Sequence, residues 1–260
     1  MYPVLFKIGG VSVETYYVIW FIALYLMLAW VIRRFDLYGI DEDEGRSVLG
    51  WSFFGMLVGS RAFEYLWNVE TYVSSPSLLL DLNSGGLSEV GALCGALLTG
   101  AFLCWRRGLP VGRMCDVAAP PAFLAVAIGR WGCFSAGCCG GVESTFPLAL
   151  HFPRDPAGLT RHPTQLYYSL AAAMILALLL FIERRADVPH RKGSSVLAPV
   201  GLILFAATRF LVDPLRSEGL SKGLLLSHWT LAAAAALSVL WLAVPRFLER
   251  CESGRPPTGL

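Results

Sequence analysis

Charged residues are scarce in this chain of 260 residues: Lys, Arg, Asp and Glu make up 15% of it, whereas apolar residues make up 55%. Soluble domains usually carry about 25% charged residues, so the composition excludes an ordinary soluble protein and indicates an integral membrane protein. The 7 cysteines are too few for a disulfide scaffold in a chain of this length. Repeats and low-complexity tracts are lacking. We expect no cleavable signal peptide, because the first apolar run has neither a basic segment before it nor a small-residue cleavage site after it.

Seven apolar segments have the length of about 17–25 residues that a bilayer requires. They are expected at residues 15–32, 48–67, 87–105, 114–132, 165–183, 196–213 and 225–245. The fourth is the least regular, because Pro120 and Pro121 should kink or offset it, and the stretch from Gly129 to Gly141 should descend into a loop. We therefore predict an all-α integral membrane protein with about seven transmembrane helices.

Lys and Arg residues are distributed unequally between the two sets of loops that join these segments. Thirteen lie on one side, and five lie on the other, namely Lys7, Arg154, Arg161, Arg216 and Lys222. The positive-inside rule then places the amino terminus outside and the carboxyl terminus in the cytoplasm. Within this topology we expect a small periplasmic cap over residues 137–163, a single polytopic membrane domain over 1–251 and a flexible cytoplasmic tail over 252–260.

Three arginines lie inside the apolar segments: Arg61, Arg130 and Arg209. A charge at membrane depth costs about 2.5–3.5 kcal/mol on insertion scales, so such residues usually serve a function. Three of them predict a polar cavity that receives an anionic group. A phospholipid head group is the obvious candidate, because the guanidinium fork matches a phosphate.

Two of these arginines have an acidic residue nearby on the same helix face. Arg209 and Asp213 are four residues apart, and Arg61 and Glu64 are three apart. Each pair can simply neutralise both charges for burial, or it can hold the guanidinium while that group also meets a phosphate. Arg216 falls another turn toward the outside.

The glycine- and cysteine-rich stretch around Arg130 is the most unusual in the chain. Its glycines let backbone N–H groups approach a phosphate, or they serve close packing of membrane helices. Cys133, Cys138 and Cys139 lack the paired spacing of a zinc site, and no fourth ligand is evident in the sequence nearby, so we expect no metal and no cofactor. A disulfide remains open, and packing of small side chains is the preferred interpretation.

Polar residues at the start of two apolar segments are further candidates for the site. His162 is expected at the outer interface, as a general base, a phosphate ligand or a partner of a loop carbonyl. Thr164 is a candidate cap for the helix that follows. Tyr16 and Tyr17 begin the first segment and fit an interfacial aromatic belt, with lining of the site as the alternative.

These segments together resemble the prolipoprotein diacylglyceryl transferase family, in a divergent variant whose signature contains cysteine. The matches are Tyr2-Pro3, Phe6–Gly9, Gly59-Ser60-Arg61 with Tyr65, Gly85–Ser88, Gly129-Arg130-Trp131-Gly132, Gly141, His162–Tyr167 and Arg209-Phe210 with Arg216. The Gly-Arg-x-Gly and His-Pro-x-Gln motifs are specific when they occur in this order on seven spans.

The resemblance implies a transferase of the bacterial cytoplasmic (inner) membrane. In that reaction phosphatidylglycerol donates its diacylglyceryl group to the lipobox cysteine thiol of a lipoprotein precursor. Its partners would be phosphatidylglycerol, precursor signal peptides and membrane lipids, without nucleic acid. Tyr16, Arg130, Gly141 and Arg209 fall where the family keeps functional residues. We expect Arg130 and Arg209 to act in catalysis, with Tyr16, His162 or Glu89 as the alternatives for proton transfer. The implied phosphatidylglycerol-binding residues are Arg61, Arg130, Gly132, Gly141, Arg209, Asp213 and Arg216.

The chain departs from the family pattern at several positions. Val90 stands where many members have a catalytic His, and Cys133, Cys138, Tyr168 and Asp213 replace the family's Asn, acidic residues and late Glu. Valine cannot move a proton, and Glu89 lies about 100° around the helix from it. A non-catalytic or repurposed paralogue that binds phospholipid or precursor is therefore the alternative function. A transporter or channel is a third, since intramembrane arginines also line anion paths.

Overall fold

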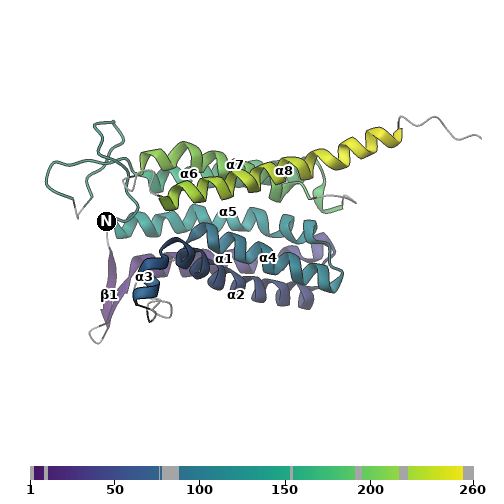
Figure 1. The fold of residues 1–260 in the computed structure, drawn as a ribbon, viewed down its shortest axis with the longest axis horizontal. Helices are drawn as coiled ribbons and strands as arrows, with labels where there is room; N and C mark the ends of the chain where they lie inside the picture. The colour runs from purple at the N-terminus through teal and green to yellow at the C-terminus, as the bar shows by residue number, and fades with distance from the viewer. Residues whose placement is uncertain are drawn as a thin grey trace, which may run out of the picture. The chain divides into compact units, whose positions relative to one another are not determined.

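The computed structural model describes residues 3–8, 11–75, 77, 88–152, 155–190, 195–216 and 222–253. The chain divides into two compact units, the first formed by Met1–Arg34 with Cys115–Leu260 and the second by Phe35–Met114. Helices dominate both units (Figure 1). Residues 254–260 of the expected tail and residues 85–87, where the third segment is expected to begin, lie outside the described residues.

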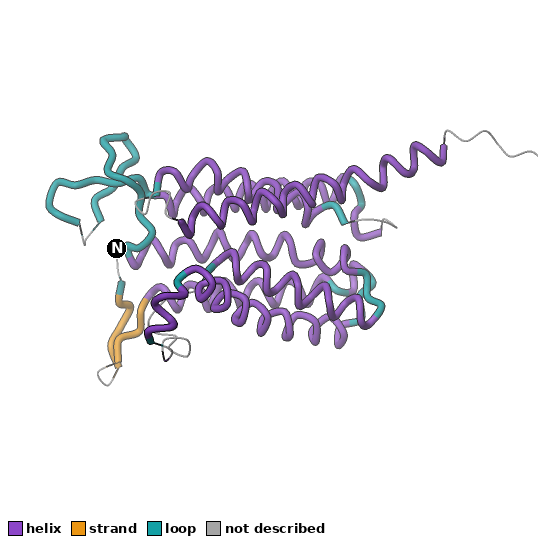
Figure 2. The backbone as a smooth tube through the Cα atoms, viewed as in Figure 1, coloured by secondary structure: helices purple, strands orange, loops and turns teal. Residues whose placement is uncertain are grey.

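A two-stranded antiparallel hairpin opens the first unit and leads directly into its first helix (Figure 2). Strand β1 (Val4–Ile8) pairs with β2 (Val11–Glu14), and α1 runs over Thr15–Arg34. The last turn of α1 carries Arg33 and Arg34, which suit the negative end of the helix dipole. The hairpin was not predicted from the sequence, because strands this short have too few residues to show a clear period.

Four further long helices belong wholly or mostly to the first unit. They are α5 (Val111–Ala136), α6 (Thr164–Arg185), α7 (Leu197–Val212) and α8 (Lys222–Ser253), with the short 3-10 turns η4 (Val188–His190) and η5 (Asp213–Leu215) between them. Helix α7 packs along both α6 and α8 (Figure 1). This packing brings residues from three helices together at the end of α7 where η5 begins.

The second unit consists of the 3-10 turn η1 (Asp36–Tyr38), α2 (Glu42–Trp67), α3 (Val69–Ser74) and α4 (Glu89–Arg107). Asp41 caps α2 by accepting a hydrogen bond from the backbone N of Glu44 at 3.0 Å. Ser88 caps α4 in the same way, with the backbone N of Gly91 at 3.2 Å from its Oγ. Local capping chemistry therefore sets where both long helices of this unit begin.

Long helices occupy all seven positions at which the sequence predicts a membrane span. Among the described residues, five segments are long and apolar enough to cross a bilayer: Thr15–Arg34, Glu89–Arg107, Val111–Ala136, Thr164–Arg185 and Leu197–Leu215. The remaining two predicted spans fall on α2, which carries several charged residues, and on α8, whose described apolar part is His228–Ala243. The prediction of an all-α membrane protein is confirmed.

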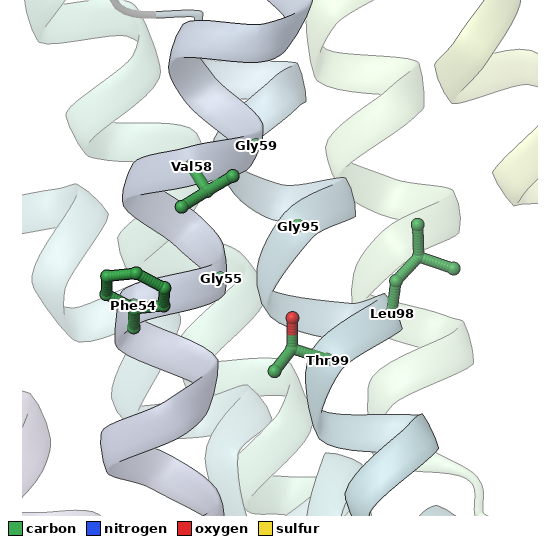
Figure 3. A pocket seen from close by; sticks show the side chains of 7 residues that line it. All are labelled: Phe54, Gly55, Val58, Gly59, Gly95, Leu98 and Thr99. Carbon is green, nitrogen blue, oxygen red and sulfur yellow. The ribbon is translucent and has the colours of Figure 1, made fainter.

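Glycines make the contact between α2 and α4. A Cβ on Gly95 would lie 2.1 Å from the Gly55 carbonyl oxygen, and one on Gly59 would lie 2.5 Å from the Gly91 carbonyl oxygen. Both helices thus carry glycines four residues apart at the contact, the small-residue pattern of close helix pairs in membranes. Beside this contact lies an apolar groove of about 280 Å³ (Figure 3), lined by Phe54, Gly55, Val58, Gly59, Gly95, Leu98 and Thr99. None of these lining residues carries a charge.

A buried ion pair joins the carboxyl-terminal ends of α1 and α6 in the first unit. Arg34 Nη2 lies 2.5 Å from Glu183 Oε1 and Nη1 lies 3.1 Å from Oε2, so the pair is bidentate. Arg34 Nε also donates to the carbonyl oxygen of Val117 at 3.0 Å. The pair therefore fixes the ends of two helices against α5.

Asp116, a buried residue of α5, supplies the amino-terminal cap that α7 lacks in its own sequence. Its carboxylate accepts hydrogen bonds from the backbone N–H groups of Val196 at 2.9 Å and Ala198 at 2.8 Å, and from the Ser195 hydroxyl. The N-cap residue itself, Val196, makes no side-chain cap bond. The start of α7 is thus fixed by a contact between helices.

Two details of the predicted helices are wrong. Helix α5 continues past Pro120, Pro121 and Arg130 to Ala136, so most of the glycine- and cysteine-rich stretch up to that residue is helical. The helix ends only at Gly137, which has a φ of 70°. Thr164 does not cap α6, because it is the first residue of the helix and its hydroxyl donates to the Cys139 carbonyl oxygen at 2.6 Å.

Candidate functional site

Asp213 is the centre of a buried polar cluster in the first unit. It is 0% exposed, and its Oδ2 lies 2.8 Å from Arg209 Nε and 2.9 Å from His228 Nε2. Its Oδ1 accepts a hydrogen bond from the Tyr168 hydroxyl and lies 4.0 Å from Arg216 Nη1. The predicted pairing of Arg209 with Asp213 is confirmed, and four groups converge on this one carboxylate.

The ring of Tyr168 brings two of the predicted arginines together. The guanidinium carbon of Arg130 lies 4.5 Å from the ring centroid, and that of Arg209 lies 5.8 Å from it. Both arginines are buried, at 6% and 4% exposure. Cations over an aromatic face are attracted to it, so the ring stabilises two guanidinium groups that would otherwise repel each other.

Arg216 and Gly141 are neighbours through a backbone bridge. The backbone N of Gly141 donates to the His162 carbonyl oxygen at 2.8 Å. A Cβ on Gly141 would lie 2.6 Å from both His162 Cβ and the Leu215 carbonyl oxygen, so only glycine fits there without displacing a neighbour. Gly141 therefore lets the loop after α5 pack against the end of η5.

His162 lies just before α6 and is half-buried. Its Nδ1 is 3.1 Å from the Tyr167 hydroxyl, and its ring packs 5.9 Å from the ring of Phe146. Its side chain therefore bonds a tyrosine hydroxyl, whereas its backbone carbonyl oxygen holds Gly141. Gly132 is also packed tightly, since its Cβ would lie 3.2 Å from the Tyr16 carbonyl oxygen of α1.

The three cysteines of the signature converge at the end of α5. The sulfur atoms of Cys133, Cys138 and Cys139 all lie within 4.8 Å of one another. Tyr16 interacts electrostatically with all three, whereas Tyr17 is 62% exposed. Hydrogen bonds with Cys133 and Cys138, together with the guanidinium groups of Arg216 and Arg130, lower the pKa of the Cys139 thiol. Cys139 therefore lies within electrostatic range of Arg130 and Arg216.

Arg61 and Glu89 belong to the second unit. Arg61 is buried, and its Nη1 lies 3.5 Å from the Tyr72 hydroxyl. Glu64 accepts a hydrogen bond from the side-chain nitrogen of Asn68 at 2.7 Å. Glu89 is the first residue of α4, and Val90 beside it is buried at 3% exposure.

His228 was not predicted as a site residue from the sequence, and Tyr168 was noted only as a departure from the family pattern. His228 follows the apolar residues Leu224–Leu226 in α8, and its ring stacks on Phe210 with centroids 4.8 Å apart. A histidine inside the seventh predicted span was the available signal, but its partner Asp213 is 15 residues away, outside any helical spacing.

Helices of this length and apolarity, with arginines and an aspartate buried among them, define an all-α membrane protein. A family model described as prolipoprotein diacylglyceryl transferase matches residues 3–247, and the chain belongs to that family. The phosphatidylglycerol–prolipoprotein diacylglyceryl transferase of Clostridium novyi is 31% identical over 230 residues, which cover 86% of this chain and 87% of the relative. The enzyme of the same name from Bacillus cereus strain ATCC 14579 is 30% identical over 255 residues, covering 95% of this chain and 93% of the relative. That from Clostridium tetani is 28% identical over 223 residues, or 84% of this chain and 86% of the relative.

Proposed function

We propose that this chain transfers the diacylglyceryl group of phosphatidylglycerol to the lipobox cysteine thiol of lipoprotein precursors. Membership of the family and the names of the relatives support this activity. The observation that carries the proposal is the convergence of Arg130 and Arg209 on the ring of Tyr168, next to Asp213. Two buried guanidinium groups held at one ring suit a phosphate.

The charge of this cluster matches the charge that the reaction creates. Arg130, Arg209 and Arg216 carry three positive charges and Asp213 carries one negative charge, which leaves two positive charges when His228 is neutral. A phosphodiester with one negative charge becomes a phosphate monoester with up to two as its C–O bond breaks. Positive groups fixed in advance therefore stabilise the transition state and the leaving glycerol phosphate more than the bound lipid.

In the transfer step, the precursor thiol loses its proton and its sulfur attacks the glyceryl carbon that bears the phosphate. The S–C bond forms, the C–O bond breaks, and glycerol phosphate leaves with the electron pair. We place the phosphate at the guanidinium groups of Arg130 and Arg209, because both lie over the ring of Tyr168. Gly132, Gly141 and Arg216 of the first unit complete the proposed binding surface.

We assign the proton transfer to His162. Its Nδ1 faces the Tyr167 hydroxyl, which orients the ring and leaves Nε2 as the nitrogen for the precursor thiol. Tyr16 and Glu89 are the other proton acceptors that the sequence offers. General acid–base help is worth about 10²–10⁴-fold, so a chain with Val90 in place of the family His retains most of the phosphate chemistry.

The proposed setting is the bacterial cytoplasmic (inner) membrane, with both units in one polytopic domain over residues 1–251. In this topology α2 and α8 also cross the bilayer, which gives seven spans, an external amino terminus and a cytoplasmic carboxyl terminus. The loop over residues 137–163 then forms a periplasmic cap. The partners are phosphatidylglycerol, the signal peptides of precursors and surrounding lipids.

The test is transfer from phosphatidylglycerol to a lipobox peptide by the purified protein, with the thioether product measured by mass spectrometry. Arg209→Ala and Arg130→Ala should each reduce the rate by at least about 100-fold, because each removes a charge from the transition state. Arg46→Ala is the matched control, since Arg46 forms an exposed pair with Glu42 in the second unit. Full activity in Arg209→Ala would overturn the mechanism.

A non-catalytic paralogue is the second candidate, and buried Val90 is the observation that favours it. It would bind phosphatidylglycerol or a precursor without turnover. Retained lipid binding, with no product while a known transferase is active in parallel, would select this alternative. In that case Arg130 and Arg209 would be lipid ligands only.

A further inference from the structure

The fold assembles a compact group of three thiols that the transfer mechanism does not use. Cys133 lies in the last turn of α5, and Cys138 and Cys139 follow just after the helix end. All three sulfur atoms lie within 4.8 Å of one another, with 3.9 Å between those of Cys138 and Cys139. The six cysteines with described side chains form no disulfide, and Cys94, Cys104 and Cys115 lie outside the group.

The turn that brings these thiols together is held in place by its backbone. Gly137 adopts a φ of 70° and ends the helix, and the backbone N of Cys138 then bonds the Cys133 carbonyl oxygen at 3.2 Å. Cys139 has a φ of 59°, a left-handed conformation that residues other than glycine seldom adopt. The turn therefore points the sulfur atoms of neighbouring residues back toward Cys133, and the sulfur of Cys138 lies 3.6 Å from the Cys133 carbonyl oxygen.

Two fully buried side chains of α6 fix this turn from the other side. The Thr164 hydroxyl donates to the Cys139 carbonyl oxygen at 2.6 Å, and the Gln165 amide donates to the Cys138 carbonyl oxygen. Both side chains are 0% exposed. Because these bonds use only the carbonyl groups of the cysteines, the turn is preorganised while the sulfur atoms remain turned toward one another.

The spacing of the sulfur atoms suits a soft metal ion. A metal–sulfur bond of about 2.3 Å in a trigonal site places the sulfur atoms about 4 Å apart. Thiolates select Cu(I) and Zn(II) over hard cations. Among the described residues, no His, Asp or Glu ligand atom joins the three sulfur atoms within the same 4.8 Å, which gives three ligands where structural zinc usually takes four.

We propose that Cys133, Cys138 and Cys139 form a three-thiolate site for a soft cation, with Cu(I) as the preferred ion. Three thiolates and one Cu(I) carry two negative charges, and Arg130 and Arg216 both interact electrostatically with Cys139 and offset that charge. The spacing of the cysteines in the sequence lacks the paired motifs of a metal site and favours simple packing. The end of α5 and the turn after it bring the three sulfur atoms together, which the spacing of the cysteines does not predict. The transfer step does not use these thiols, and the test of the site needs no turnover.

The experiment uses the purified full chain in detergent, reduced and kept free of oxygen, and titrated with Cu(I) against the chromophoric chelator bicinchoninate. One Cu(I) per chain should bind, and Cys138→Ala and Cys139→Ala should each weaken binding by at least about 100-fold. The double variant Cys94→Ala/Cys115→Ala is the matched control and should bind as the unaltered protein does. Binding that survives in Cys138→Ala and Cys139→Ala would overturn the proposal.

Alkylation of the unaltered protein keeps the test decisive if a variant fails to fold. Bound Cu(I) should protect Cys133, Cys138 and Cys139 from N-ethylmaleimide, as read residue by residue with mass spectrometry, and leave Cys94 and Cys115 as reactive as before. Equal labelling with and without Cu(I) would refute the site. A parallel titration with Zn(II) tests the choice of ion, because tighter binding of Zn(II) at the same thiols would refute the preference for Cu(I).

Discussion

Replacing Asp213 with asparagine should destabilise the chain in a way that phosphatidylglycerol repairs. Asp213 is fully buried and lies 2.8 Å from Arg209 and 2.9 Å from His228. The asparagine side chain would keep the volume and still accept a hydrogen bond from Tyr168, but it would remove the only negative charge among these contacts. The charge of Arg209 would then be buried without its carboxylate.

The expected size of this effect follows from the burial of the pair. Removing one partner of a buried ion pair costs about 3–5 kcal/mol. With a shift of about 2–4 °C in thermal midpoint per kcal/mol for chains of roughly this size, the midpoint should fall by roughly 6–20 °C. The matched control is Glu42→Gln, since Glu42 and Arg46 are also four residues apart but have side chains that are 47% and 55% exposed. That change should cost at most about 1 kcal/mol.

The assay is thermal unfolding in a neutral detergent, with and without added phosphatidylglycerol, and with phosphatidylcholine as the lipid control. A ligand that binds the folded state raises its stability by mass action. Phosphatidylglycerol should raise the midpoint of Asp213→Asn more than that of the unaltered protein, because its phosphate supplies the missing negative charge. Phosphatidylcholine carries no net charge and should give the smaller rise. If the lipids raised both midpoints equally, the placement of the phosphate at Arg209 would be refuted.

Three further predictions concern stability and are measured by thermal or denaturant unfolding. Glu183→Gln should lower the free energy of unfolding by about 3–5 kcal/mol, because it leaves the charge of Arg34 buried without its carboxylate. The double variant Arg34→Met/Glu183→Leu should recover most of this loss, because both charges are removed together. A double variant as unstable as the single one would contradict this. Gly59→Ala should lower the free energy of unfolding by about 1–3 kcal/mol, because the new Cβ would lie 2.5 Å from a carbonyl oxygen of α4. Gly50→Ala in the same helix places its Cβ in open space and should be neutral or stabilising. Equal effects of the two substitutions would exclude the close contact. Ser88→Ala should lower the free energy of unfolding by about 1 kcal/mol, because the cap on α4 is lost. Ser88→Asp should keep the cap and the stability. Unchanged stability in Ser88→Ala would show that the cap does not stabilise α4.

The sequence predicted the long helices because apolar runs of bilayer length leave few alternatives. It also predicted the contact of Arg209 with Asp213, since a spacing of four residues places both on one helix face. It failed at α5, where glycine-rich composition suggested a loop before Ala136. Only Gly137 in that stretch needed the conformational freedom of glycine to end the helix.

Contacts between helices could not be predicted from a single sequence. Tyr168 and His228 meet Asp213 only because α6 and α8 pack against α7, and no local spacing records that packing. The convergence of the three cysteines could not be predicted either, because their separation along the chain says little about the turn at Gly137. Local chemistry thus identified the arginines, and tertiary packing determined their neighbours.

Asp116 caps the start of α7 and thereby helps to fix the position of Arg209, which lies in the last turn of that helix. Asp116 holds the start of α7 through the N–H groups of Val196 and Ala198, whereas Arg209 lies near the other end of that helix. At a rise of about 1.5 Å per residue, these ends are about 18 Å apart. A rigid helix transmits a shift at one end to the other with little loss. Loosening the Asp116 contact would therefore let α7 slide along its axis and carry Arg209 out of register with Tyr168, without a substitution at Arg209 or Tyr168.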